Sequence, residues 1–183
     1  NLAERWGWRP EGTNPCRHVD RYREKGRERF LSEKELATLA DVLRDVDAKR
    51  AEADALRVKL QEDGGVSITA KYNLRGLESE SESPFVIAAV RLLIFTGARL
   101  SEILTLQWNH IDFEGAMLML PDSKTGQKVV YLSAPALQTL ADIPRIEGNP
   151  YVICGDKDGA HLVNLQKPWQ RIRKRAAIED VRL

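Results

Sequence analysis

The sequence has little cysteine and no long apolar run. Its two cysteines, Cys16 and Cys154, have no CxxC partner, which favours reduced thiols in a cytoplasmic protein over a disulfide framework. No segment reaches the roughly 20 apolar residues of a membrane span, and no secretory signal stands at the N-terminus. The three histidines show no metal-ligand spacing. We therefore expect a protein that uses no metal and has no membrane partner.

The chain also lacks an initiating methionine, because it begins at Asn1 and its two methionines are Met117 and Met119. We expect a fragment or a processed piece of a longer protein. With 183 residues, 43% of them apolar and 30% charged, the chain is long enough for one core and a short appended segment.

Charge of one sign is not in excess overall, since the net charge is only +1, but it is unevenly distributed. Residues 17–29 hold six basic against three acidic side chains, and residues 167–182 hold six against two. The acidic side chains gather between residues 41 and 82. Such segregation is what a one-sided contact with DNA requires. Two solvated helical faces would give the same pattern.

The longest apolar segment, residues 85–95, is interrupted only by Arg91 and predicts a helix buried on nearly all sides. Ser83 is its expected N-cap and Pro84 its first helical residue. Thr96-Gly97 is expected to end it, because glycine readily adopts the positive φ of a helix C-terminus.

A second short helix is predicted to begin at Arg99, with Glu102 three residues later on the same face. Leu100, Ile103, Leu104 and Leu106 would hold this helix against the core. A guanidinium fixed at a turn and oriented by a carboxylate suits a phosphate, which it can grip with two parallel hydrogen bonds. A purely structural Arg–Glu pair explains this stretch alone equally well.

The rest of the chain predicts further helices around a small antiparallel meander. Residues 64–83 are expected to be the least ordered part, with a short strand at 66–69. The expected elements are a helix from the capping box at Ser32, strands at 108–113, 116–120 and 128–132, a polar loop at 121–127, helices at 135–142 and 164–177, and a strand-like run at 151–154.

This order of elements resembles the catalytic domain of tyrosine site-specific recombinases, the phage-type integrases. Thr96–Trp108, followed by Ile111-Asp112, matches the family's first conserved box, and Ser123-Lys124-Thr125-Gly126 matches its lysine-bearing hairpin. The resemblance implies the DNA breaking-rejoining fold, an α+β fold that is mainly α-helical with a small three-stranded antiparallel sheet. Residues 1–14 would end the preceding core-binding domain, 15–30 would form a basic interdomain linker, and 31–183 would be the N-terminal part of the catalytic domain.

The resemblance also implies a reaction. In this family a tyrosine hydroxyl attacks a DNA phosphodiester, forms a 3′-phosphotyrosine and releases a 5′-hydroxyl, without a metal or another cofactor. Arg99 would be the first catalytic arginine and Lys124 the general acid for the leaving oxygen, with Lys128 as its rival and Glu102 as a brace for Arg99. The expected partners are double-stranded DNA attachment sites of a phage or other mobile element and further copies of the protein, as a tetramer on DNA.

The resemblance also implies a role for the last helix, because the equivalent helix of this family presents its N-terminal end to the major groove. We therefore expect two groups of DNA-binding residues there, one for base edges and one for phosphates, and a third in the linker. They are Asn164, Gln166 and Lys167; Arg171, Arg173 and Lys174; and Arg21, Arg23, Arg27 and Arg29.

One departure from the family limits this expectation. The family's second box, His-x-x-Arg and then His or Trp before the tyrosine nucleophile, would follow the last basic helix, and the chain stops at Ile178–Leu183. We expect the 183 residues to bind DNA but neither to cleave nor to rejoin it. Two alternatives remain at this point: a non-catalytic DNA-binding module derived from a recombinase, and a helical interaction protein whose charged runs are ordinary surface.

Overall fold

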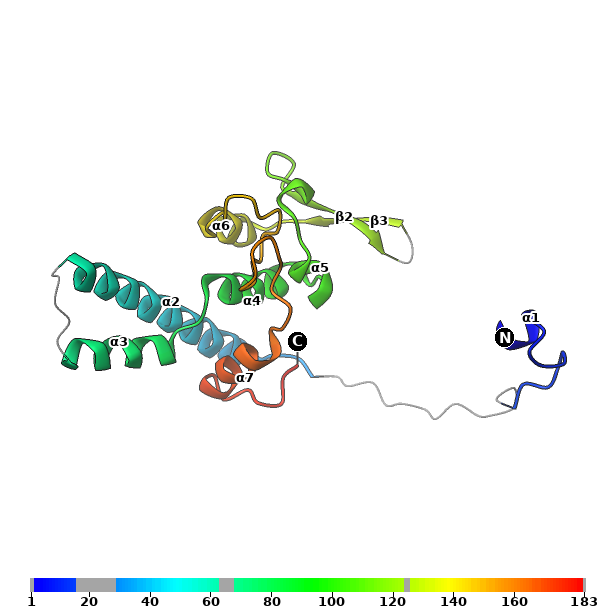
Figure 1. The fold of residues 1–183 in the computed structure, drawn as a ribbon, viewed down its shortest axis with the longest axis horizontal. Coiled ribbons are helices and arrows are strands. Elements are labelled where there is room, and N and C mark those ends of the chain that lie inside the picture. Colours follow the sequence, from blue (N-terminus) through cyan, green and yellow to red (C-terminus); the bar gives the residue numbers. More distant parts are fainter. Residues whose placement is uncertain (1, 16–28, 63–67, 124–125, 183) are drawn as a thin grey trace. The chain divides into compact units, whose positions relative to one another are not determined.

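The computed structural model describes residues 2–15, 29–62, 68–123 and 126–182, and it divides into two units, Asn1–Phe30 and Leu31–Leu183 (Figure 1). The smaller unit contains the short helix α1 (Leu2–Arg5). After it, the exposed rings of Trp6 and Trp8 meet edge to face, with 5.1 Å between centroids. Most of the predicted basic linker lies outside the described residues.

The larger unit is mainly helical and carries one small sheet, as predicted (Figure 1). Its sheet has the order β1-β2-β3, and both pairings are antiparallel. Leu118 in the middle strand faces Ile111 on one side and Val130 on the other. The elements are α2 (Glu33–Glu62), α3 (Ile68–Glu80), α4 (Pro84–Thr96), α5 (Leu100–Leu104), the 3₁₀ helix η1 (Trp108–His110), β1 (Ile111–Asp112), β2 (Met117–Ser123), β3 (Gly126–Tyr131), α6 (Ala134–Asp142) and α7 (Gln166–Arg175).

The N-terminus of α2 is the predicted capping box. The backbone N–H of Ser32 donates to Glu35 Oε2 at 2.8 Å, and the N–H of Glu35 donates to Ser32 Oγ at 3.3 Å. These two bonds satisfy donors that a helix end leaves without partners. The helix then continues without a break for 30 residues, further than its apolar pattern indicates.

The prediction for residues 64–83 was wrong for the part that the structure describes. Residues 68–80 form α3, which runs beside α2, and no strand includes Ile68 or Thr69 (Figure 1). None of residues 69–80 is fully buried, so the apolar pattern of α3 is weak. Ion pairs to α2, Glu78 with Arg57 and Glu80 with Lys49, favour the helix. Tertiary contacts have therefore overridden local propensity.

Helix α4 has both predicted ends. Ser83 Oγ accepts from the N–H of Phe85 at 3.3 Å, and Gly97, with φ of 60°, donates its N–H to Leu93 O at 3.0 Å. Its single charged residue, Arg91, pairs with Asp47 of α2 at 2.6 Å, so the charge stays on the α2 side of a buried helix.

Three other predictions need correction at their ends. The expected strand at 108–113 begins as η1, because the ring of His110 accepts from the backbone N–H of Gln107 at 3.3 Å and bends the chain. The run 151–154 makes only the single bridges Gln107–Tyr151 and Cys154–His161. The last helix is shorter than 164–177, since it begins after Asn164 and ends before Ala177, which has φ of 54°.

The core lies around α4, against which α5, α6 and α2 pack. Buried side chains from the sheet and from α7, such as Leu118, Trp169 and Ile172, complete it. In the described ranges, no helix combines the length and apolarity needed to cross a bilayer. The fold thus fixes the ends of α5, β3 and α7 on one rigid core, and these ends carry the candidate residues.

Candidate functional site

Arg99 lies at the corner between α4 and α5. The left-handed turn at Gly97 ends α4, and Arg99 is the N-cap residue of α5. The buried side chains Ile103 and Leu104 anchor α5 in the core, whereas Leu100 is partly exposed. The Arg99 side chain is 70% exposed. A permanently charged group therefore stands at a rigid corner where an external anion can reach it.

The carboxylate of Glu102 accepts two hydrogen bonds from Arg99. Its Oε2 accepts the backbone N–H of Arg99 at 2.8 Å, and its Oε1 accepts from Arg99 Nη1 at 3.3 Å. The Glu102 side chain is only 15% exposed. The predicted pairing of the two residues on one face of α5 is therefore present.

A second cation meets the same carboxylate. Lys128 Nζ donates to Glu102 Oε2 at 2.8 Å, from a position on β3 opposite Leu120 of β2. Burial is the largest influence on the pKa of Glu102 and would raise it. The hydrogen bonds from Lys128 and from the Arg99 backbone, with their charges, outweigh burial, so the pKa of Glu102 lies below its ordinary value. The carboxylate is therefore ionised at neutral pH.

Of the two hairpin lysines, only Lys128 can be located. Lys124 lies outside the described residues, so its role as general acid stays a prediction. The contact between Lys128 and Glu102 joins residues 26 positions apart, and no local sequence pattern indicates it. Only the proximity of β3 to the start of α5 reveals the pair.

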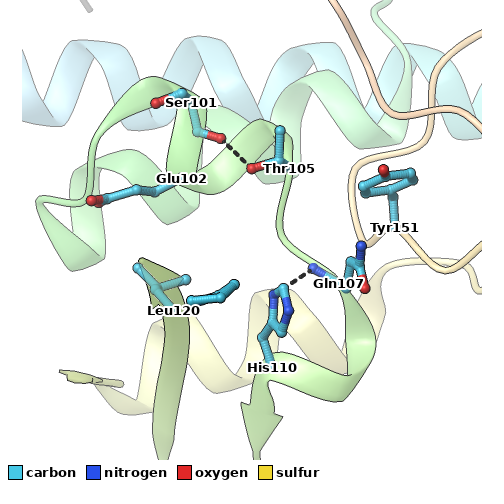
Figure 2. Close-up of a pocket in the computed structure, with 8 residues that line it drawn as sticks. Ser101, Glu102, Thr105, Gln107, His110, Leu120 and Tyr151 are labelled. Atoms are coloured by element: carbon cyan, nitrogen blue, oxygen red, sulfur yellow. Dashed lines mark hydrogen bonds between the residues drawn. The ribbon is translucent and has the colours of Figure 1, made fainter. Parts of the chain in front are cut away.

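A polar hollow of about 340 Å³ opens beside Glu102 (Figure 2). Within its wall, Thr105 Oγ1 donates to the backbone oxygen of Ser101 at 2.8 Å, and His110 accepts from Gln107. Such a wall suits a polar ligand better than the apolar small molecules that most deep pockets hold. The lining residues come from α5, η1, β2 and the segment after α6; they are Ser101, Glu102, Thr105, Gln107, His110, Leu120, Pro121 and Tyr151.

The N-terminal end of α7 lies at a second hollow, of about 800 Å³. Two of the predicted base-reading residues, Asn164 and Gln166, line it together with Leu100, the neighbour of Arg99. Asn164 Oδ1 also accepts the backbone N–H of Gln166, the first residue of α7, at 2.8 Å. Lys167 is exposed. The structure thus brings the starts of α5 and α7 to one surface hollow.

Gln170 is not among the residues that the sequence predicts to bind DNA. It is exposed and lines the second hollow, one helical turn after Gln166. The four-residue spacing from Gln166 was the available signal, since residues four apart share a helix face.

Arg171 forms an ion pair with Glu82. Its Nε and Nη2 donate to the two carboxylate oxygens of Glu82 at 2.6 and 2.7 Å. The side chain of Glu82 is 8% exposed and that of Arg171 is 55% exposed. The hydrogen bonds that Arg171 donates to this carboxylate raise the pKa of Arg171 above its ordinary value. The predicted contact of Arg171 with phosphate is untested, and the two bonds instead support a role of the guanidinium in holding α7 to the segment before α4.

The other predicted phosphate contacts differ in their surroundings. Arg173 Nη1 donates to the backbone oxygen of Val181 at 2.9 Å, whereas Lys174 is exposed on α7. In the smaller unit, Arg29 is exposed and its Nη1 donates to the neighbouring Phe30 oxygen. The linker residues Arg21, Arg23 and Arg27 lie outside the described residues.

Comparison with known proteins supports the resemblance found in the sequence. The chain is 30% identical over 70 residues to the prophage integrase IntF of Escherichia coli (strain K12), a match that spans 37% of this chain and 15% of that integrase. No protein-family model matches the chain.

Two solved structures are similar in fold. The XerA recombinase aligns with a TM-score of 0.53 at 15% identity, over 88% of this chain and 47% of that one. The Tn1549 transposon integrase (residues 82–397), solved in complex with circular intermediate DNA, aligns over 96% of this chain and 70% of that one, with a TM-score of 0.39 at 15% identity, too low to support an argument. The fold expected from the sequence, helical with a three-stranded antiparallel sheet, is confirmed.

Proposed function

We propose that this chain, which has the fold of a tyrosine recombinase and shares a sequence stretch with a prophage integrase, is the phosphate-binding part of a phage-type integrase. The observation that carries the proposal is the Arg99 corner: an exposed guanidinium, braced by a poorly exposed carboxylate, at a rigid turn between two helices. A DNA phosphate is the ligand that suits such a group best.

The full-length protein would carry out site-specific DNA recombination by transesterification. A tyrosine oxygen supplied from outside these 183 residues would attack the phosphorus, and the bond to the 5′ oxygen would break, leaving a 3′-phosphotyrosine. Arg99 would stabilise the charge that develops on the non-bridging oxygens. Lys124 would give its proton to the departing 5′ oxygen. In the second step a 5′-hydroxyl released in the same way from the partner strand would attack the phosphorus. The bond to the tyrosine oxygen would break, that oxygen would take up a proton, and a phosphodiester would be restored.

Double-stranded DNA would lie across the starts of α5 and α7. Three observations support this placement of the DNA: Asn164 and Gln166 share a hollow with Leu100, Lys167 is exposed, and Lys174 is exposed two turns further along the same face of α7. Asn164, Gln166 and Lys167 would meet base edges, and Lys174, with Arg173, would meet phosphates. The linker arginines Arg21, Arg23, Arg27 and Arg29 would add backbone contacts, and several protomers, as a tetramer, would assemble on the DNA.

Duplex binding tests the proposal directly. Fluorescence anisotropy with a labelled duplex should show an affinity that falls steeply as salt rises, because each phosphate contact releases about 0.9 of a counterion. Replacing Arg99 with alanine should weaken binding about tenfold and lower the slope of log K against log salt by about one. Arg44→Ala is the matched control, since Arg44 is an exposed arginine of α2 that pairs with Asp41. A wild-type affinity that does not depend on salt would refute the proposal.

Cleavage is a separate test. We expect the 183 residues alone to form no covalent adduct with a nicked suicide substrate that carries the cognate attachment site. An adduct would show that the chain holds its own nucleophile. If adducts also fail to form with a longer chain that includes the second box and its tyrosine, the non-catalytic DNA-binding module becomes the better description.

A further inference from the structure

Arg99, Glu102 and Lys128 form one hydrogen-bonded group of three charges. Glu102 Oε2 accepts both from Lys128 Nζ and from the Arg99 backbone N–H, each at 2.8 Å, and Oε1 accepts from the Arg99 guanidinium at 3.3 Å. The shorter side-chain contact is the one to Lys128. The long contact and high exposure of Arg99 show that the carboxylate holds this guanidinium loosely.

The charges of this group matter for an incoming phosphate. Together the three side chains carry one net positive charge. Without Lys128, the ionised Glu102 would offset the charge of Arg99, and among the described residues its remaining side-chain partner would be Arg99. The carboxylate is 15% exposed, so water screens it only in part. An unpaired Glu102 would therefore both repel a phosphate and draw the guanidinium away from it.

We propose that Lys128 is a positioning residue for the phosphate site: it neutralises Glu102, so that the charge and the donors of Arg99 stay available to DNA. This rests on the function proposed above. Lys128 then acts through Glu102 and not as a proton donor or a phosphate ligand. Its ammonium donates to a carboxylate on α5, and its side chain is only 35% exposed, half the exposure of Arg99. The pair also ties β3, which follows the predicted lysine loop, to the start of α5.

A charge-rescue experiment on the 183-residue chain tests the inference. Lys128→Met removes the ammonium and keeps a side chain of similar length. Duplex affinity, measured by anisotropy at fixed salt, should fall about three- to tenfold, the range expected for one surface charge several ångströms from a phosphate. Adding Glu102→Gln removes the charge that Lys128 neutralised, while the amide oxygen still accepts from the Arg99 N–H. The double variant should return to within about twofold of wild type.

Controls separate this role from a general structural one. Lys128→Arg keeps the charge and the donors and should bind like wild type, and Lys49→Met removes a lysine that pairs with Glu80 and Asp45 away from the site. Circular dichroism checks that each variant is folded. If Lys128→Met fails to fold, the double variant Lys128→Met/Glu102→Gln still tests the inference. Its affinity should lie within about twofold of those of wild type and Lys128→Arg.

Two results would overturn the inference while leaving the proposed function intact. In the first, the wild type binds DNA and Lys128→Met binds equally well. In the second, the double variant stays as weak as Lys128→Met and its salt slope has fallen by about one, because Lys128 then touches a phosphate itself. Absence of salt-dependent binding by the wild type would instead overturn the proposed function, and this inference with it.

Discussion

Replacing Arg171, which pairs with Glu82, tests whether this arginine contributes to folding or to DNA binding. The sequence reading assigned Arg171 to phosphate, but the structure gives it two hydrogen bonds to a carboxylate that is 8% exposed. Arg171→Ala would leave this carboxylate charged and without its two donors. Arg171 joins α7 to the residues just before α4. Loss of its pair with Glu82 should therefore lower the free energy of unfolding of the whole larger unit.

The loss of unfolding free energy in Arg171→Ala can be estimated from the exposure of Arg171 and Glu82. Removing one partner of a fully buried ion pair destabilises a protein by about 3–5 kcal/mol. Arg171 is 55% exposed and its pairing is partly screened, so we expect a smaller loss, about 2 kcal/mol. For a domain of this size that corresponds to a decrease in Tm of about 4–8 °C. Arg171→Ala/Glu82→Gln should recover part of the loss, because no buried charge is then left unpaired.

The assay combines urea unfolding with duplex binding. Arg171→Ala should lower the unfolding free energy and leave the salt slope of DNA binding unchanged, whereas Lys174→Ala should leave stability unchanged and reduce the slope by about 0.9. The opposite pattern, full stability with a reduced slope for Arg171→Ala, would mean that the guanidinium leaves Glu82 for a phosphate, and the reasoning from the pair would be refuted.

Three further predictions concern the corner itself. Gly97→Ala should lose about 1 kcal/mol in urea unfolding, because φ is 60°, whereas Gly76→Ala within α3, where an added Cβ meets nothing within 4 Å, should gain about 0.5–1 kcal/mol; equal effects would contradict the helix end. Ile103→Ala should lose about 2–4 kcal/mol, since Ile103 is fully buried; a loss below about 1 kcal/mol would place α5 outside the core. Because the folded pKa of Glu102 lies below 4.5, its ionised form contributes stability that is present above that pH and lost as pH falls through the folded pKa. The stability difference between wild type and Glu102→Gln should therefore shrink as pH falls below about 5, and a constant difference would contradict the ion pairs.

Local signals accounted for the ends of the helices that hold the candidate site. A capping serine with a following proline starts α4, and a glycine ends it, because these residues have conformational preferences that depend little on the rest of the chain. The same holds for the pairing of Arg99 and Glu102, which one turn of helix brings together. The predicted strand at 108–113 was wrong over residues 108–110, because the ring of His110 accepts a hydrogen bond from the Gln107 backbone and these residues form η1.

Residues far apart in the sequence could not be paired in the same way. Neither the contact of Lys128 with Glu102 nor that of Arg171 with Glu82 has a local pattern, since each depends on how β3 and α7 pack against the core. Helix α3 likewise formed where the composition indicated disorder, because α2 supplied partners for its acidic side chains. The sequence by itself determined where Arg99, the proposed phosphate ligand, stands and that Glu102 braces it, because both lie within one helical turn. Only the tertiary structure decided that Lys128 pairs with Glu102 and Arg171 with Glu82, because these contacts depend on how β3 and α7 pack against the core.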